Sequence, residues 1–452
     1  MGDFTSIFKA YDVRGVVPSE FDASMAHAIG AAFARVMHDE DPAVTRVLVA
    51  RDMRPSGVDM VAAFARGACS QGIDVVDLGL GSTDLLYFAA GSMNAPGAMF
   101  TASHNPAQYN GIKFCRSGAR PVGEESGLML VRDLAISDLD PTGTPGSVSQ
   151  LDLLGQFAAH VRSFVDVSKL TPLKVVADVA NGMGGLVVPA AFEGLPFELE
   201  LMYPELDGTF PNHPADPIQP ENQRDLIARV VESGADIGLA FDGDADRVFL
   251  VDELGVGLSG STTTAILADA ILKRNPGGTV VYNLICSHAV AEVIAEAGGV
   301  GVRTRVGHSF IKQVMAEQDA VFGGEHSAHY YFTDNYRADS GLIAAVLVLE
   351  QMCLRDMPLS ELRKPYERYA ASGEINTKVA DTAAVIEHVA TAYQGFTQDR
   401  LDGLTVQADG WWFNLRPSNT EPLLRLNLEA ATPAKVAERV AEVRAHFELP
   451  SS

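Results

Sequence analysis

Residues 46–77 read RVLVARDMRPSGVDMVAAFARGACSQGIDVVD, and this segment gives the clearest indication of the fold. Arg46 to Ala50 is an apolar run with the length of a buried strand. Apolar residues then recur with a helical period from Gly57 to Gly72, and a second apolar run covers Ile73 to Asp77. A strand, a helix and a strand in this order form a βαβ unit with parallel strands. The segment therefore predicts an α/β domain.

The same alternation starts again twice further along the chain. We expect strands at 173–178, 235–241 and 278–282, a glycine-rich turn at 181–185, and helices at 262–273 and 340–353. The C-terminal stretch differs, because 411–415 and 423–429 resemble alternating strands and 433–447 a closing helix. Turn-forming residues at 139–146, 253–260 and 369–374 are candidate linkers. The sequence thus predicts three α/β units in series and a smaller α+β unit.

Composition and charge exclude several classes of protein. The chain has 452 residues with 34 Lys+Arg against 58 Asp+Glu, so its formal net charge is −24. A protein with this charge repels nucleic acids and anionic membranes, so we expect neither as a partner. The N-terminus lacks the pattern of a secretory signal, and no apolar run reaches the length of a transmembrane helix. The four cysteines are far apart, as is typical of reduced thiols, and we expect a cytoplasmic protein.

The strongest chemical signal is Asp242-Gly-Asp-Ala-Asp-Arg247, which directly follows the predicted strand ending at Phe241. Ligands of α/β sheets bind at the carboxyl ends of strands, so three carboxylates at alternate positions there can converge on one Mg²⁺ ion. An EF-hand calcium loop also spaces acids by two, but it needs glycine at its sixth position, where this chain has Arg247. The adjacent arginine indicates an anion beside the metal, and phosphate fits both.

A second signal is Thr101-Ala-Ser-His-Asn-Pro106, again after an apolar strand. A serine with an adjacent histidine can be a nucleophile or a phosphoryl carrier, although this loop lacks the GxSxG elbow of hydrolases. An ordinary polar turn is equally compatible with the motif by itself.

Two further clusters fit a sugar phosphate. Gly323-Gly-Glu-His-Ser-Ala-His329 places a carboxylate and a hydroxyl at alternate positions, which suits vicinal sugar hydroxyls, and its alternative is a polar strand end. Arg416-Pro-Ser-Asn-Thr-Glu-Pro422 offers a guanidinium group, hydroxyls and an amide, which suits a phosphate group, and its alternative is a tight hairpin loop.

Together these motifs resemble the α-D-phosphohexomutase family, most closely its bacterial phosphomannomutase/phosphoglucomutase group. The resemblance runs from Phe8-Lys-Ala-Tyr-Asp-Val-Arg-Gly15 to the 416–422 motif, in the same order and spacing. It implies three similar mixed-sheet α/β domains and a smaller C-terminal α+β domain around a central cleft. We expect the domains at residues 1–146, 147–257, 258–370 and 371–452.

The resemblance also implies roles for individual residues. Ser103 would carry the phosphoryl group, and Asp242, Asp244 and Asp246 would hold Mg²⁺ against it, with Ser103 as a further ligand. The other catalytic residues would be Arg14 near the transferring phosphate, His104, Lys113, Arg247 on the oxyanion, and His308 as a proton-transfer group. Substrate would be bound by Tyr11, by Glu325, Ser327 and His329 at the sugar, and by Arg416, Ser418, Asn419 and Thr420 at the non-reacting phosphate.

The implied reaction interconverts hexose 6-phosphate and hexose 1-phosphate of mannose or glucose. Phosphoserine would donate to the free hydroxyl, and the resulting hexose 1,6-bisphosphate, which is both intermediate and activator, would turn around and return its other phosphate. Closure of the C-terminal domain would exclude water. The resemblance further implies a monomer or weak homodimer that binds small hexose phosphates.

Alternative functions remain open at this point. A phosphoglucosamine mutase is less favoured because Thr101 and His326 depart from its usual motifs, and a hexose bisphosphate synthase or phosphopentomutase remains possible. From other classes, a Mg²⁺-dependent sugar-phosphate phosphatase and a non-catalytic sugar-phosphate sensor use similar groups. Two departures from the family concern the substrate: Ile285 occupies the place of a cationic residue, and Ala328 that of a glycine.

Overall fold

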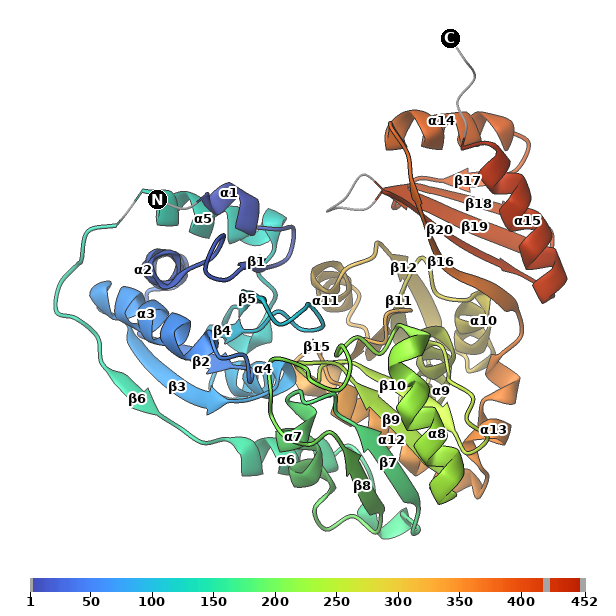
Figure 1. Cartoon of the computed structure of the whole chain (residues 1–452), viewed down its shortest axis with the longest axis horizontal. Coiled ribbons are helices and arrows are strands. Elements are labelled where there is room, and N and C mark those ends of the chain that lie inside the picture. The colour runs from blue at the N-terminus through green and yellow to red at the C-terminus, as the bar shows by residue number, and fades with distance from the viewer. Residues whose placement is uncertain (1–2, 138, 418–422, 448–452) are drawn as a thin grey trace.

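The computed structural model describes residues 3–137, 139–417 and 423–447, which form four units along the chain. Three units are built on separate mixed sheets and the fourth on an antiparallel sheet, so the predicted fold class is confirmed. In Figure 1 the first unit (blue) and the fourth unit (red) lie at opposite ends, with the second (green) and third (yellow to orange) between them.

The first unit has a six-stranded sheet in the order β1-β5-β4-β2-β3-β6. Its strands are β1 Val13–Val16, β2 Arg46–Arg51, β3 Asp74–Leu80, β4 Gly97–Phe100, β5 Tyr109–Cys115 and β6 Val148–Gln150. Its helices are α1 Phe4–Ile7, α2 Ala23–Glu40, α3 Gly57–Ser70, α4 Thr83–Ser92 and α5 Leu128–Ile136. Alternate residues of β2 point to opposite faces, so Val47 and Val49 pack with α2, α3 and α5 while Leu48 and Ala50 pack with α4. The sheet is therefore covered on both sides.

One detail of the first unit differs from the predicted boundary at residue 146. Strand β6 follows that boundary, yet Val148 to Gln150 pairs in parallel with β3, so the first sheet continues to Gln150. The predicted linker 139–146 likewise contacts this unit, because Gly146 N donates to Cys69 O at 2.9 Å. A short polar strand at a sheet edge has no apolar pattern, which is why the sequence did not reveal it.

The second unit is a four-stranded sheet in the order β10-β9-β7-β8. It contains α6 Leu154–Arg162, β7 Lys174–Asp178, α7 Gly184–Phe192, β8 Glu198–Met202, α8 Arg224–Ser233, β9 Ile237–Phe241 and β10 Val248–Asp252. All five residues of β9 are buried, which explains the continuous apolar run of 237–241.

The third unit is a five-stranded sheet in the order β12-β11-β13-β14-β15. It contains α9 Gly260–Arg274, β11 Thr279–Asn283, α10 His288–Glu296, β12 Val300–Thr304, α11 His308–Glu317, β13 Phe322–Gly324, β14 Tyr330–Phe332, β15 Ala338–Asp339, α12 Gly341–Arg355 and α13 Leu359–Leu362. Apolar residues of α4, of the second unit and of α9 and α12 share one hydrophobic core. The first three units are therefore packed into one body.

The fourth unit has the antiparallel order β16-β20-β19-β18-β17. It contains β16 Ala370–Lys378, α14 Thr382–Ala392, β17 Thr397–Asp399, β18 Leu404–Ala408, β19 Trp411–Pro417, β20 Leu423–Ala430 and α15 Pro433–Ala445. Its apolar residues form a core of their own. All four cysteines of the chain are free, and no helix of the described residues is long and apolar enough to cross a membrane.

Candidate active site

The loop between β4 and β5 presents Ser103. The Ser103 N–H donates to Thr101 Oγ1 at 2.9 Å, and Ser103 itself adopts the left-handed region with a φ of 47°. Its hydroxyl donates to Asp242 Oδ2 at 2.7 Å and lies 3.2 Å from His104 Nδ1. The side chain is nearly buried, with 4% of the residue exposed. The structure therefore brings together the two strongest motifs, which lie 139 residues apart.

Three buried aspartates follow β9, as the sequence predicts. One carboxylate oxygen of each of Asp242, Asp244 and Asp246 lies within 4.8 Å of the others. Gly243 lets this loop approach the first unit, because a Cβ there would lie 2.4 Å from the Ser103 carbonyl oxygen. Arg247 Nε donates to Asp242 Oδ2 at 2.9 Å. The serine, the carboxylates and the arginine thus form one contiguous group.

Lys113, on β5, supplies positive charge from the first unit. Its Nζ donates to Asp244 Oδ2 at 2.7 Å and to Asp246 Oδ2 at 2.6 Å. Burial by itself would lower the pKa of Lys113, but the two carboxylates raise it well above its ordinary value. For the same reason the pKa of Asp244 stays below its ordinary value in spite of burial. Lys113 is therefore a permanent cation at this site.

The aspartate group fits a divalent cation. Asp244 Oδ1 and Asp246 Oδ1 are buried and make no hydrogen bond with any residue that the structure describes. Burial, followed by the charge of neighbouring carboxylates, raises the pKa of Asp242 and of Asp246. Carboxylate oxygens are the ligands that Mg²⁺ prefers. The charge of the group and its two oxygen atoms without a hydrogen bond among the described residues both favour such an ion.

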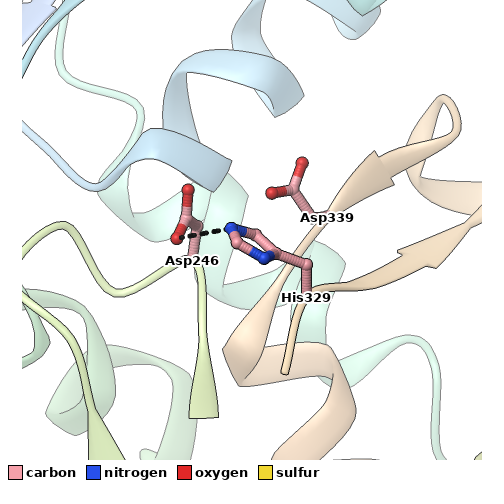
Figure 2. A group of neighbouring side chains, drawn as sticks. All are labelled: Asp246, His329 and Asp339. Atoms are coloured by element: carbon pink, nitrogen blue, oxygen red, sulfur yellow. Dashed lines mark ion pairs between the residues drawn. The ribbon is translucent and has the colours of Figure 1, made fainter. Parts of the chain in front are cut away.

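A second group of possible metal ligands shares Asp246 with the first. Figure 2 shows His329 between Asp246 and Asp339, with His329 Nε2 3.8 Å from Asp246 Oδ1. Asp339 already pairs with the buried Lys312 at 2.8 Å, and His329 Nδ1 lies 3.1 Å from Ser327 Oγ. Since one carboxylate is neutralised and one ligand is a nitrogen, this group suits Mg²⁺ less well than the three aspartates do. The contacts of His329 with Asp246 and Ser327 instead orient its ring toward the three aspartates.

Glu325 directly follows β13, and both of its carboxylate oxygens accept hydrogen bonds. Tyr331 donates its hydroxyl to Oε1 at 2.6 Å, and Asn283 Nδ2 donates to Oε2 at 3.0 Å. The Gly307 N–H also donates to Oε2, at 3.2 Å. The carboxylate is therefore held in one orientation from three segments of the third unit.

The N-terminal residues reach the same region. Arg14 contacts Asp12 and the side chain of Asn105, which belongs to the serine loop. Tyr11 donates its hydroxyl to the carbonyl oxygen of Val306 at 3.2 Å, just before α11. The protein atoms packed around His104, reinforced by the charges of Arg247 and Arg14, hold its pKa below its ordinary value, although part of the residue is exposed to solvent. The lowered pKa favours the neutral form of this imidazole.

The fourth predicted motif is described only in part. Arg416 is buried near the end of β19, where its guanidinium donates to Asn427 Oδ1 at 2.8 Å and to Glu374 Oε2 at 2.6 Å. Ser418, Asn419 and Thr420 lie outside the described residues. His308 is the first residue of α11, and its side chain also lies outside the described part of the structure. Their roles stay predictions.

Several residues at the site were not predicted from the sequence. Thr83 Oγ1 donates to Asp244 Oδ2 at 2.5 Å, and Arg54 Nη2 donates to the Ser103 carbonyl oxygen at 2.9 Å. A signal for Arg54 was present, because Asp52-Met-Arg54 directly follows β2, whose neighbour β4 precedes the serine loop. Of the two departures, Ile285 is buried beside the fourth unit, and Ala328 is buried with a φ of 66°.

Comparison with known proteins gives consistent results along the chain. Four models of the phosphoglucomutase/phosphomannomutase family match: alpha/beta/alpha domain I at residues 5–133, domain II at 155–255, domain III at 259–369 and the C-terminal domain at 374–446. A phosphomannomutase of Escherichia coli is 39% identical over 435 residues, covering 94% of both chains. Proteins named phosphohexose mutases, from Xanthomonas campestris, are 40% identical over 438 residues, covering 95% of this chain and 96% of the relative.

A solved structure has the same architecture. The crystal structure of a phosphoglucomutase/phosphomannomutase family protein from Burkholderia thailandensis superimposes with a TM-score of 0.90 at 32% sequence identity. The match covers 99% of this chain and 97% of that one.

Proposed function

Because the chain belongs to the phosphoglucomutase/phosphomannomutase family, we propose that it is a phosphohexomutase, which interconverts the 6-phosphate and 1-phosphate of mannose or glucose. One observation carries this proposal: Ser103 Oγ donates to Asp242 Oδ2 at 2.7 Å, inside a buried group of three carboxylates. A phosphoryl carrier and a cation site are thus in direct contact. Such contact is what phosphoryl transfer requires, since positioning and charge neutralisation dominate its catalysis.

Ser103 is the carrier in this proposal. Asp242 accepts the hydroxyl hydrogen bond and orients Oγ, while Arg247 stands beside the same carboxylate. Mg²⁺ held by Asp242, Asp244 and Asp246 would neutralise charge on the transferring phosphoryl group. Lys113 and Arg247 add fixed positive charge on either side, and we assign Arg14 to the same phosphate.

Proton transfer falls to groups around Ser103. His104 Nδ1 lies 3.2 Å from Ser103 Oγ, so it can accept the hydroxyl proton in the first phosphorylation of the enzyme once the hydroxyl turns from Asp242 to the imidazole. His329 Nε2 faces Asp246 and is placed to exchange a proton with the sugar hydroxyl that receives the phosphoryl group. We keep His308 as a second candidate for that step.

Substrate recognition is divided between the third and fourth units. Glu325, Ser327 and His329 would bind sugar hydroxyls, and Tyr11 would line the same region. The Arg416 motif, with Ser418, Asn419 and Thr420, would bind the phosphate that does not react. This division lets one site hold whichever phosphate is not reacting, both before and after a hexose 1,6-bisphosphate intermediate turns around.

We further propose that the protein acts in the cytoplasm as a monomer or weak homodimer whose ligands are small sugar phosphates. Its net charge of −24 disfavours polyanionic partners. Oligomeric state can be measured by sedimentation velocity.

Phosphorus NMR tests the proposed function. With Mg²⁺ and a trace of glucose 1,6-bisphosphate, the wild-type protein should convert mannose 1-phosphate and glucose 1-phosphate to the 6-phosphates without releasing inorganic phosphate. In Ser103→Ala the conversion rate should fall at least about 1000-fold, because the variant lacks the hydroxyl that carries the phosphoryl group. The variant should still bind substrate. Ser163→Ala, a serine at the end of α6, is the matched control.

Other outcomes would contradict the proposal or support one of the alternative functions. Full activity of Ser103→Ala contradicts the assignment of the carrier. Stoichiometric release of phosphate would make the protein a phosphatase, and conversion of glucosamine 1-phosphate alone would make it a phosphoglucosamine mutase.

A further inference from the structure

Arg54 is a buried arginine that belongs to none of the motifs described above. It follows β2 and has no exposed surface. Its guanidinium donates to four backbone carbonyl oxygens: Nη1 to Pro106 at 2.8 Å and Tyr109 at 2.9 Å, and Nη2 to Ser103 at 2.9 Å and Asn105 at 2.7 Å. Nε donates to Asp52 Oδ2 at 3.1 Å. All five N–H bonds of the guanidinium group are therefore used.

The four carbonyl oxygens share one property, because all belong to residues 103–109, which comprise the loop that carries the phosphoryl acceptor and the first residue of β5. A planar guanidinium fixes several acceptors in one plane, whereas a lysine ammonium has three donors and no fixed plane. Backbone carbonyl groups that face the buried Arg54 need a partner, and this loop has little regular structure to supply one. Arg54 thus supplies the hydrogen-bond donors that a neighbouring strand would supply in a β-sheet.

Fixing this loop matters because Ser103 adopts an uncommon backbone conformation. Its φ of 47° lies in the left-handed region, which non-glycine residues seldom occupy unless their surroundings hold them there. Arg54 binds the carbonyl of Ser103 itself and that of Asn105 two residues later. It therefore holds the turn that aims Oγ at Asp242.

Arg54 is itself held from two sides. Asp52, also without exposed surface, accepts from both the backbone N–H and Nε of Arg54. The second unit covers the opposite side, because the guanidinium lies 5.1 Å from the centre of the Phe210 ring. Gly208 allows this approach, since a Cβ there would lie 2.7 Å from the Arg54 Cα. The arginine is thus locked between β2 and the unit that carries the aspartates.

From this geometry we propose that Arg54 is a positioning residue for phosphoryl transfer. It fixes the backbone of residues 103–109. Ser103 Oγ therefore keeps its position beside the aspartate group both when the serine accepts a phosphoryl group and when it donates one. The proposal rests on the proposed function, because it assumes that Ser103 accepts and donates the phosphoryl group. Arg54 touches neither substrate nor metal in this role.

Steady-state kinetics of Arg54→Lys and Arg54→Met test the proposal. A shift of the nucleophile by about 1 Å costs on the order of 100-fold in rate, so kcat should fall by about 100-fold or more in both variants. The KM for hexose phosphate should stay within about threefold, because the residues that bind substrate are untouched. Arg116→Lys is the matched control: this arginine lies in the same unit, pairs with Glu40 and also donates to a backbone carbonyl, that of Pro121. It should keep the wild-type kcat.

Amide hydrogen exchange supplies a readout that does not depend on activity. In Arg54→Lys, amides of residues 103–111 should exchange faster, while those of α2 and β2 keep their protection. Wild-type kcat, or unchanged exchange in the loop, overturns the proposal. Loss of protection across the whole first unit in both variants, or failure of both to fold, also overturns it, because Arg54 would then be a general structural residue.

The two proposals fail in different ways. If the wild-type protein converts no hexose phosphate, the proposed function fails, and unchanged loop exchange would then also remove the role of Arg54. If the wild-type protein is active and Arg54→Lys is equally active, the function stands and only the role of Arg54 is lost.

Discussion

At the scale of single residues, Lys113 decides the charge of the site in the absence of metal. Three buried aspartates face Lys113 and Arg247, so the carboxylates outnumber the adjacent cations. Removing one partner of a buried ion pair leaves a charge without compensation, which costs about 3–5 kcal/mol. The stability of the protein should therefore depend on Mg²⁺ more strongly when Lys113 is absent.

The variant Lys113→Met tests this dependence. We expect the thermal midpoint of the variant in EDTA to fall well below that of the wild-type protein. Adding Mg²⁺ should then raise the midpoint of the variant by more than it raises that of the wild type, since a divalent cation can replace the missing charge. Differential scanning calorimetry with and without Mg²⁺ measures both shifts. Lys273→Met, which breaks an exposed pair with Asp269 on α9, should change the midpoint little. Equal Mg²⁺-induced shifts in the wild-type protein and Lys113→Met would contradict the prediction.

At the scale of secondary-structure elements, Asp84 joins two helix N-termini across units. It lies in the first turn of α4 and accepts from Ser340, the N-cap residue of α12, at 2.6 Å. Burial raises the pKa of Asp84 to about 7, against about 3.9 in an unfolded chain. The folded protein thus binds this proton more tightly than the unfolded chain does. The stabilisation from this proton is complete below about pH 4 and is lost as the pH rises through about 7.

Asp84→Asn should remove this dependence on pH. Between pH 4 and 7 the wild-type free energy of unfolding should lose up to about 1.4 kcal/mol per pH unit relative to the variant, the slope for a single proton. Urea midpoints of both proteins across this range, measured in EDTA, give the difference. Asp59→Asn is the control, because Asp59 occupies the first turn of α3 but is exposed. Parallel midpoint curves for the wild-type protein and Asp84→Asn would refute the prediction.

At the scale of the whole molecule, the fourth unit is a body with its own core that contacts the third unit. Trp412 of β19 stacks on His288 of α10 with ring centres 5.2 Å apart, and Glu429 Oε1 accepts from the His288 N–H at 3.2 Å. A cavity of about 270 Å³ beside them is lined in part by residues 366–369, where the chain crosses between the units. We therefore predict that the fourth unit turns against the third when substrate binds.

Tryptophan fluorescence reports such a movement directly, since Trp411 and Trp412 are the two tryptophans of the chain. In Trp411→Phe, saturating hexose phosphate should shift the emission to longer wavelength, because rotation breaks the stack with His288 and admits water to a ring that is now buried. Trp412→Phe keeps only Trp411, which packs within the fourth unit, and should show no shift. An unchanged spectrum of Trp411→Phe at saturation would exclude the movement.

Local patterns in the sequence were sufficient for most of the fold and for the chemical groups of the site. The buried strands β2 and β9 are continuous apolar runs, and Asp242, Asp244 and Asp246 alternate directly after one of them. These features depend on residues close together in the chain, where periodicity and turn chemistry act. The polar edge strand β6 carries no such pattern and was found only in the structure.

The partners of those groups came from the three-dimensional packing of distant segments. Ser103 meets Asp242, Lys113 meets Asp244, and Glu325 is held by Tyr331 and Asn283 because separate sheets bring their loops together. The role of Arg54 also depends on its burial, which no local pattern encodes. Charge, burial and hydrogen bonding at each atom are sums over neighbours from several units. The sequence therefore established the fold and the type of chemistry, whereas the folded arrangement established the contacts that would allow that chemistry to occur.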